Sequence, residues 1–158
     1  MNRLHALGSG VALLAVASVA PAWGAVVINQ SDEINLSVFV PCANGGAGEV
    51  VELSGPLHTL VTFRFNGHQV GGKGHFQPQG LSGTGLTTGD SYRGVGVTQS
   101  IFSGSLENGK FTETFVNNFR IIGQGRGNNF AVHENFHLTI NANGEVTTFR
   151  DNFSADCK

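Results

Sequence analysis

The sequence predicts an all-β protein, an antiparallel up-and-down β-barrel of about eight strands in a single domain. Three observations support this fold class. Apolar and polar residues alternate with a period of two from Phe111 to Phe153, and residues two apart share one face of a strand. Glycine-bearing turns separate the alternating segments, as hairpins require. No segment after residue 24 has helical periodicity, and consecutive hairpins favour an up-and-down barrel over a Greek-key sandwich.

Residues 1–24 have the pattern of a secretory signal peptide, so we expect the barrel domain to occupy residues 25–158. Arg3 precedes an Ala/Val/Leu-rich run, and small residues around Ala22 offer a cleavage site. The run is shorter than the ~20 apolar residues that a spanning helix needs. The sequence therefore predicts a secreted protein, periplasmic or extracellular, with no membrane anchor after signal removal.

The charge balance argues against a nucleic-acid partner. The chain has 9 Lys and Arg against 11 Asp and Glu, a formal charge of −2. Loss of residues 1–24 would remove Arg3 and no acid, leaving 8 against 11, or −3. Nucleic acids and anionic membranes are bound by basic patches, which this composition does not favour.

Cys42 and Cys157 are the two cysteines of the chain. In an exported protein a lone pair most often forms a disulfide. This bond would tie the start of the fold to its last residues. A redox or metal site is the less favoured alternative, because neither cysteine belongs to a CxxC motif.

Before residue 111 the alternation and the turn residues define the expected elements in order. Residues 25–33 are expected to be irregular, Ser54–Pro56 to form a turn, and residues 43–48 to be a glycine-rich loop with room for a short helix. The ten glycines from Gly67 to Gly96 suggest bends, bulges or close backbone approach. The expected strands are Ile34–Val40, Glu49–Leu53, Leu57–Asn66, His68–Gln77, Leu81–Thr87 and Ser91–Phe102.

The three strands between residues 111 and 153 repeat one design, with an aromatic side and a Thr/Asn/Arg/His side. The aromatic side should face inward, because burying each Phe contributes roughly 1.5–3 kcal/mol. Each aromatic side also carries one acid: Glu113, Glu134 or Asp151. Glu113 and Asp151 are expected near strand ends, where they reach solvent, whereas Glu134 lies in mid-strand. Glu134 is therefore the leading candidate for a functional acid, with Asn117 as its partner.

The run FRIIGQGRGNNFAVHENFHLTINANGEV, followed by a Phe/Cys element at the end of the chain, resembles a group of small exported bacterial proteins. The resemblance covers roughly the last third of the chain and, more loosely, residues 57–96. The group has no assigned activity, so the resemblance implies export and a single domain but transfers no catalytic residues. Lipocalins offer a fold-level analogy, but their early Gly-x-Trp signature is absent here, since the sole tryptophan is Trp23.

No metal ion or cofactor is predicted. His133 and His137 share a strand face, but at ~3.3 Å per residue they start about 13 Å apart, too far to share one zinc ion. Arg64, Arg120 and Arg150 are expected on the solvated outer face. The chain has no Gly-x-Ser-x-Gly elbow and no phosphate-binding loop.

The favoured function is a non-enzymatic binding module for a small apolar or amphipathic ligand. Two alternatives stay open: a cyclase- or isomerase-type barrel enzyme using Glu134 as its acid/base, and a structural or adhesive surface protein with a filled barrel. The sequence names no ligand and no oligomeric state. The predicted ligand-binding residues are Glu134, Asn117, Phe115, Phe119, Phe136 and Tyr92.

Overall fold

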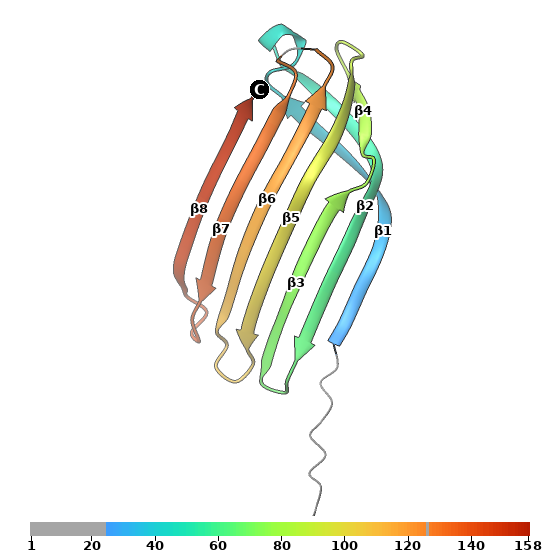
Figure 1. The fold of residues 1–158 in the computed structure, drawn as a ribbon. Helices are drawn as coiled ribbons and strands as arrows, with labels where there is room; N and C mark the ends of the chain where they lie inside the picture. The colour runs from blue at the N-terminus through green and yellow to red at the C-terminus, as the bar shows by residue number, and fades with distance from the viewer. Residues whose placement is uncertain (1–24, 126) are drawn as a thin grey trace, which may run out of the picture.

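The computed structural model describes residues 25–125 and 127–158. The predicted signal peptide, residues 1–24, lies outside this part of the chain. Within it, every regular element except one short 3₁₀ helix is a β-strand (Figure 1). The elements are β1 Ala25–Val40, η1 Asn44–Gly46, β2 Glu49–Phe65, β3 Gln69–Pro78, β4 Ser82–Gly85, β5 Ser91–Ser105, β6 Phe111–Gly123, β7 Phe130–Ile140 and β8 Val146–Cys157.

All ladders are antiparallel and follow the chain order, β1-β2-β3-β5-β6-β7-β8. β4 pairs with both β2 and β5, which are also the neighbours of β3. β3 and β4 are therefore successive segments of one interrupted strand. No helix in the described part of the chain is long and apolar enough to cross a membrane.

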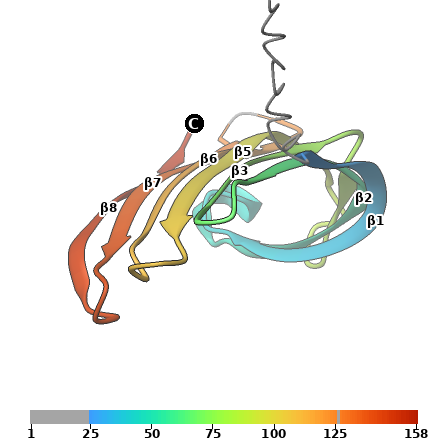
Figure 2. The same ribbon diagram turned by 90° about the horizontal axis from the view of Figure 1, so that it is seen from below.

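The sheet rolls up into a barrel-shaped core with extra strands beyond it. Seen from below in Figure 2, β1 and β2 curve round to form a ring with β3 and β5, while β7 and β8 extend away from the ring. Within the described residues no ladder joins β1 to β8. The predicted all-β antiparallel barrel of about eight strands is confirmed.

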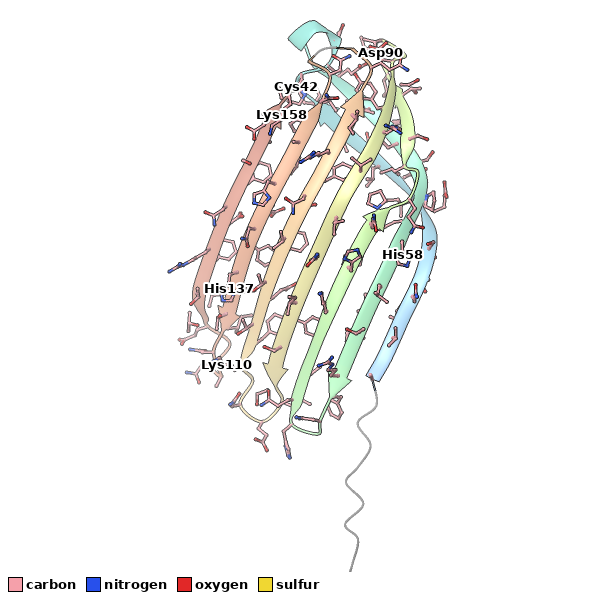
Figure 3. The ribbon with its side chains drawn as sticks, viewed as in Figure 1. Cys42, His58, Asp90, Lys110, His137 and Lys158 are labelled. Atoms are coloured by element: carbon pink, nitrogen blue, oxygen red, sulfur yellow. A yellow bond between two sulfur atoms is a disulfide. The ribbon has the colours of Figure 1, made fainter. Side chains whose placement is uncertain are left out.

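The two ends of the barrel differ. One end, here called the disulfide end, holds η1 and the Cys42–Cys157 bond, with a Cα–Cα distance of 5.6 Å. Figure 3 shows Cys42, Asp90 and Lys158 at this end and Lys110 at the other. The opposite, hairpin end carries the turns at residues 66–68, 106–110 and 141–145. The predicted disulfide is confirmed, and it joins the end of β8 to the segment that follows β1.

The hydrophobic core lies at the disulfide end. Its buried side chains come from β1, β2, β5, β6, β7 and the loops next to them. Partly buried residues of β1, β6 and β7 pack against this cluster. The buried core residues are Val40, Cys42, Ala43, Val51, Leu53, Leu81, Tyr92, Ile121 and Phe130.

Two expectations about the first strands are wrong. Residues 25–33, expected to be irregular, belong to β1 and pair with residues 56–64 of β2. The expected turn at Ser54–Pro56 lies inside β2, which runs unbroken. The carbonyl oxygen of Pro56 accepts a hydrogen bond from the amide of Gln79, between β3 and β4. The nitrogen of Pro56 points to the same side, toward the gap between β3 and β4. No ladder hydrogen bond is lost there, so the strand tolerates a proline.

The cross-strand register confirms that the aromatic side chains share one face. Phe115 lies opposite Phe136, which lies opposite Asp151. This face, here called the inner face, is the one that carries the buried side chains of the core at the disulfide end. Phe149 and Phe153 on β8 remain 64% and 62% exposed, because no further strand covers that edge.

Candidate functional site

A cavity of about 410 Å³ opens on the inner face, between β1 and the strands opposite it. Three β1 residues form one wall, and residues of β5 and β6 form the other. Most of the lining is apolar. The lining residues are Ile34, Leu36, Val38, Leu57, Phe76, Pro78, Gly96, Val97, Thr98, Asn117 and Phe119. Cavities of this size and character are typical of small-molecule sites.

One hydrogen-bonded polar pair lies in this apolar lining. The hydroxyl of Thr98 donates to Oδ1 of Asn117 at 2.9 Å, and the two residues are direct cross-strand partners. Within the described residues the side-chain amide nitrogen of Asn117 makes no hydrogen bond, so it can donate to another group. The Thr98–Asn117 pair thus gives the mostly apolar wall of the cavity one polar group.

Glu134, for which Asn117 is the predicted partner, lies next to Asn117 on the neighbouring strand. Glu134 on β7 is the direct cross-strand neighbour of Asn117 and is half-buried. Glu134 does not line the cavity itself but stands one strand away from its wall. Side chains in such pairs have Cβ atoms about 4.5–5.5 Å apart. A ligand that fills the cavity and extends over β7 would therefore meet this carboxylate.

Aromatic rings continue from the cavity along the inner face. Phe115 and Phe136 stack with ring centroids 5.1 Å apart, and Phe149 follows Phe136 at 6.5 Å. A second row joins Phe63, Phe102 and Phe111 on β2, β5 and β6. Gly72 of β3 makes room for this row, since a Cβ there would collide with the ring of Phe102. The inner face thus carries two groups of aromatic side chains, one on β6, β7 and β8 and one on β2, β5 and β6.

Tyr92, predicted to bind ligand, lies elsewhere. It is 1% exposed in the core at the disulfide end, and its hydroxyl donates to Glu49 at 2.8 Å. Tyr92 is not among the residues that line the cavity. The structure therefore brings Asn117, Phe119 and Glu134 together, places Phe115 and Phe136 next to them, and separates Tyr92 from the group.

Glu49 is the buried acid of this fold, at 2% exposure. The amides of Thr87 and Thr88 donate to its carboxylate at 3.1 and 3.0 Å, and the Thr88 hydroxyl donates at 2.9 Å. Gly85 lies against the same carboxylate, and a Cβ at Gly85 would overlap it. Glu49 thus fastens the β4–β5 turn over the disulfide end of the barrel.

The pKa values of this pair move in opposite directions. Burial alone would raise the pKa of the Glu49 carboxyl, but the hydrogen bonds from Thr88, Tyr92 and Thr87 stabilise the charged form and leave the pKa lowered. Burial, and then the adjacent Glu49 carboxylate, raises the pKa of the Tyr92 hydroxyl. At neutral pH the pair is therefore a carboxylate that accepts from a neutral phenol, which suits a structural role.

Sequence reasoning missed both Glu49 and the β1 wall of the cavity. The donors to Glu49 lie 38 to 43 residues further along the chain, so no local pattern links them. The alternation in Ile34–Val40 does place Ile34, Leu36 and Val38 on one face. It does not say which strand they face across the barrel.

A second hollow, of about 460 Å³, lies over β1, β2 and β4. Its lining includes Asn35, Ser37, Glu52, Ser54 and Thr84, whose side chains are polar and exposed. This composition does not suit an apolar ligand. We therefore place the candidate site at the inner-face cavity.

The strand histidines lie on the opposite, outer face, and three of them hydrogen-bond to neighbouring side chains. His58 hydrogen-bonds to Asn29 at 2.8 Å, His133 to Asn118 at 2.6 Å and His137 to Thr114 at 2.9 Å. In residues 25–125 and 127–158, no group of three or more His, Cys, Asp or Glu residues is arranged to hold a metal ion.

Comparison of the chain with protein-family models, curated proteins and solved structures finds no match. The functional argument therefore depends on the geometry of the site.

Proposed function

We propose that this chain is a non-enzymatic binding module for a small apolar or amphipathic ligand, held in the inner-face cavity. The observation that carries the proposal is the cavity itself, about 410 Å³ in volume and mostly apolar, with the Thr98–Asn117 pair on its wall. Sites for small ligands combine such an apolar lining with a few polar groups that fix orientation. Glu134, Phe115 and Phe136 extend the same surface beyond the cavity.

We also propose that the protein works after export. The Cys42–Cys157 disulfide is consistent with an oxidising compartment, where such bonds form and persist. The signal-peptide pattern in residues 1–24 and the resemblance to small exported proteins support the same location.

The proposal can be tested with N-phenyl-1-naphthylamine, an uncharged dye that fluoresces in apolar surroundings. The purified domain should bind the dye with saturable fluorescence and a stoichiometry near one. The variant Leu57→Trp places a large ring in the cavity and should weaken dye binding by about tenfold or more, the equivalent of roughly 1.4 kcal/mol. Titration of both proteins gives the comparison.

Leu60→Trp is the matched control. Leu60 lies on the same strand and is also half-buried, but it is on the outer face, away from the cavity. This variant should bind the dye as the wild type does. Equal binding by wild type, Leu57→Trp and Leu60→Trp would show that the dye does not use the cavity and would refute the proposal.

A further inference from the structure

Charged residues in the strands are sorted between the two faces of the sheet. All five Lys and Arg residues in strands lie on the outer face and are exposed: Arg64, Lys73, Arg93, Arg120 and Arg150. Five of the eight strand acids lie on the inner face: Asp32, Glu49, Glu113, Glu134 and Asp151. Within the described strands, the inner face therefore carries negative charge and no lysine or arginine.

Two of these acids have no hydrogen-bonded side-chain partner within the described residues: Glu134, one strand from the cavity wall, and Asp151, one strand further away. Glu49 is satisfied by the turn above it, and Glu113 accepts from the Ser100 hydroxyl at 2.8 Å. No side-chain hydrogen bond or salt bridge among residues 25–125 and 127–158 involves Glu134 or Asp151. Glu134 is half-buried and Asp151 is exposed, so both carboxylates are accessible to a cation, and Glu134 gains more from one because it is less hydrated.

Glu134 and Asp151 flank an aromatic surface. Asp151 lies directly opposite Phe136, and Glu134 lies directly opposite Phe153, so the two acids are diagonal neighbours on β7 and β8. Diagonal side chains are about 7–8 Å apart. The stacked rings of Phe115 and Phe136, and the tilted ring of Phe149 next to them, lie in the same area. An ammonium group above Phe136 would meet ring faces, which attract cations, and both carboxylates.

We propose that the ligand of the inner-face site is a cationic amphiphile, an amine or quaternary ammonium compound with an apolar body. This inference rests on the proposed function and names the ligand class. The apolar body fills the cavity at Leu36, Leu57 and Phe119. The cationic group lies over Phe136, between Glu134 and Asp151. Asn117, which belongs to the cavity wall and adjoins Glu134, connects the two parts of the site.

The test compares three probes with one ten-carbon chain and different head groups: decyltrimethylammonium (cationic), decyl glucoside (neutral) and decanesulfonate (anionic). Each is titrated below its micelle concentration by calorimetry at low ionic strength. We expect the cation to bind about tenfold more tightly than the neutral probe, and the anion to bind most weakly. Raising the salt concentration to about 500 mM should reduce the preference for the cation, since salt screens exposed charges.

The double variant Glu134→Gln/Asp151→Asn keeps the shape of both side chains and removes their charge. It should weaken cation binding by about tenfold and leave the neutral probe unchanged. The control Glu33→Gln/Glu52→Gln removes two acids from the outer face and should change neither affinity. Circular dichroism confirms that each variant is folded.

The outcomes separate the two proposals. Equal affinities for all three probes, with Leu57→Trp weakening them all, would overturn the cationic class and leave the binding function standing. A preference for the cation that survives in Glu134→Gln/Asp151→Asn would also overturn this inference. Failure of every probe to bind the wild type would overturn both proposals.

Discussion

Glu49 and Glu134 are both acids on the inner face of one sheet, yet their surroundings are opposite. At the disulfide end, Glu49 is 2% exposed and accepts hydrogen bonds from Thr87, Thr88 and Tyr92. Glu134 is half-buried beyond the ring of strands, with a row of phenylalanines and the cavity as its neighbours. Both acids lie on the inner face, so the nearby donors account for the difference: Glu49 accepts hydrogen bonds that fix it in the fold, whereas no side-chain hydrogen bond within the described residues involves Glu134.

Loss of the disulfide should have the largest effect on the disulfide end. The bond spans 115 residues, and closing a loop of about that length stabilises the folded state by about 4.7 kcal/mol in the chain-entropy model. We expect Cys42→Ser/Cys157→Ser to lower the free energy of unfolding by up to that amount, as measured by urea denaturation. Wild-type protein in reductant is the control and should match the variant. An unchanged midpoint in both samples would contradict this account.

Replacing Glu49 should change both the stability and its pH dependence. The folded-state pKa of Glu49 lies below its ordinary value of 4.5, so the carboxylate stabilises the fold above that pH. This stability is lost as the pH falls from 4.5 through the folded-state pKa. Glu49→Gln should therefore be less stable than wild type at pH 7 and lose less stability on acidification.

Urea denaturation at pH 7, 5 and about 3 would measure this difference. Glu52→Gln is the matched control, because Glu52 is exposed on the outer face of the same strand. Parallel pH profiles for wild type and Glu49→Gln would show that Glu49 is not the stabilising acid.

Tyr92→Phe tests a single bond of the same network. The variant keeps the ring in the core and removes the hydroxyl that donates to Glu49. Hydrogen bonds to charged groups are worth about 1.5–3 kcal/mol, and we expect a loss of stability in that range, smaller than that caused by Glu49→Gln. Thermal and urea denaturation measure it. In the double variant Glu49→Gln/Tyr92→Phe, the second substitution should lower the free energy of unfolding by less than it does in the wild type. If the two losses of stability simply add, the two side chains are not coupled.

Glu134→Gln should have the smallest effect on stability. Its side chain is outside the core, and substitutions away from buried networks usually change stability by no more than about 0.5 kcal/mol. We expect a urea midpoint close to wild type, together with weaker binding of decyltrimethylammonium. A loss of stability comparable to that of Tyr92→Phe would mean that Glu134 is a second structural acid, and the contrast with Glu49 would fail.

Much of the fold could be predicted because period-two alternation depends on neighbouring residues alone. Phe115, Asn117 and Phe119 share one face because they are two residues apart in a strand. The turn between β6 and β7 makes these strands neighbours, and Phe136 lies on the same face opposite Phe115. The Asn117–Glu134 pairing could be predicted on the same basis. The disulfide followed from the presence of two cysteines in a chain whose first 24 residues have the pattern of an export signal.

The failures came from long-range contacts. Residues 25–33 form a strand because β2 offers seventeen residues of partner backbone, and their own alternation is weak. Pro56 suggested a turn, but it lies opposite the interruption between β3 and β4, where its missing N–H costs no ladder bond. Tyr92 could not be separated from the ligand surface, because its partner Glu49 is 43 residues away.

The position of the Cys42–Cys157 bond has a consequence for cleavage of the backbone. Residues 42 to 157 form a covalent ring, so one proteolytic nick anywhere between these cysteines leaves a single molecule of unchanged mass apart from one added water. The exposed turn at residues 106–110 is the natural place for such a cut. Two fragments would separate on a gel only after reduction, and the nicked protein would keep both halves of its sheet tethered at the disulfide end.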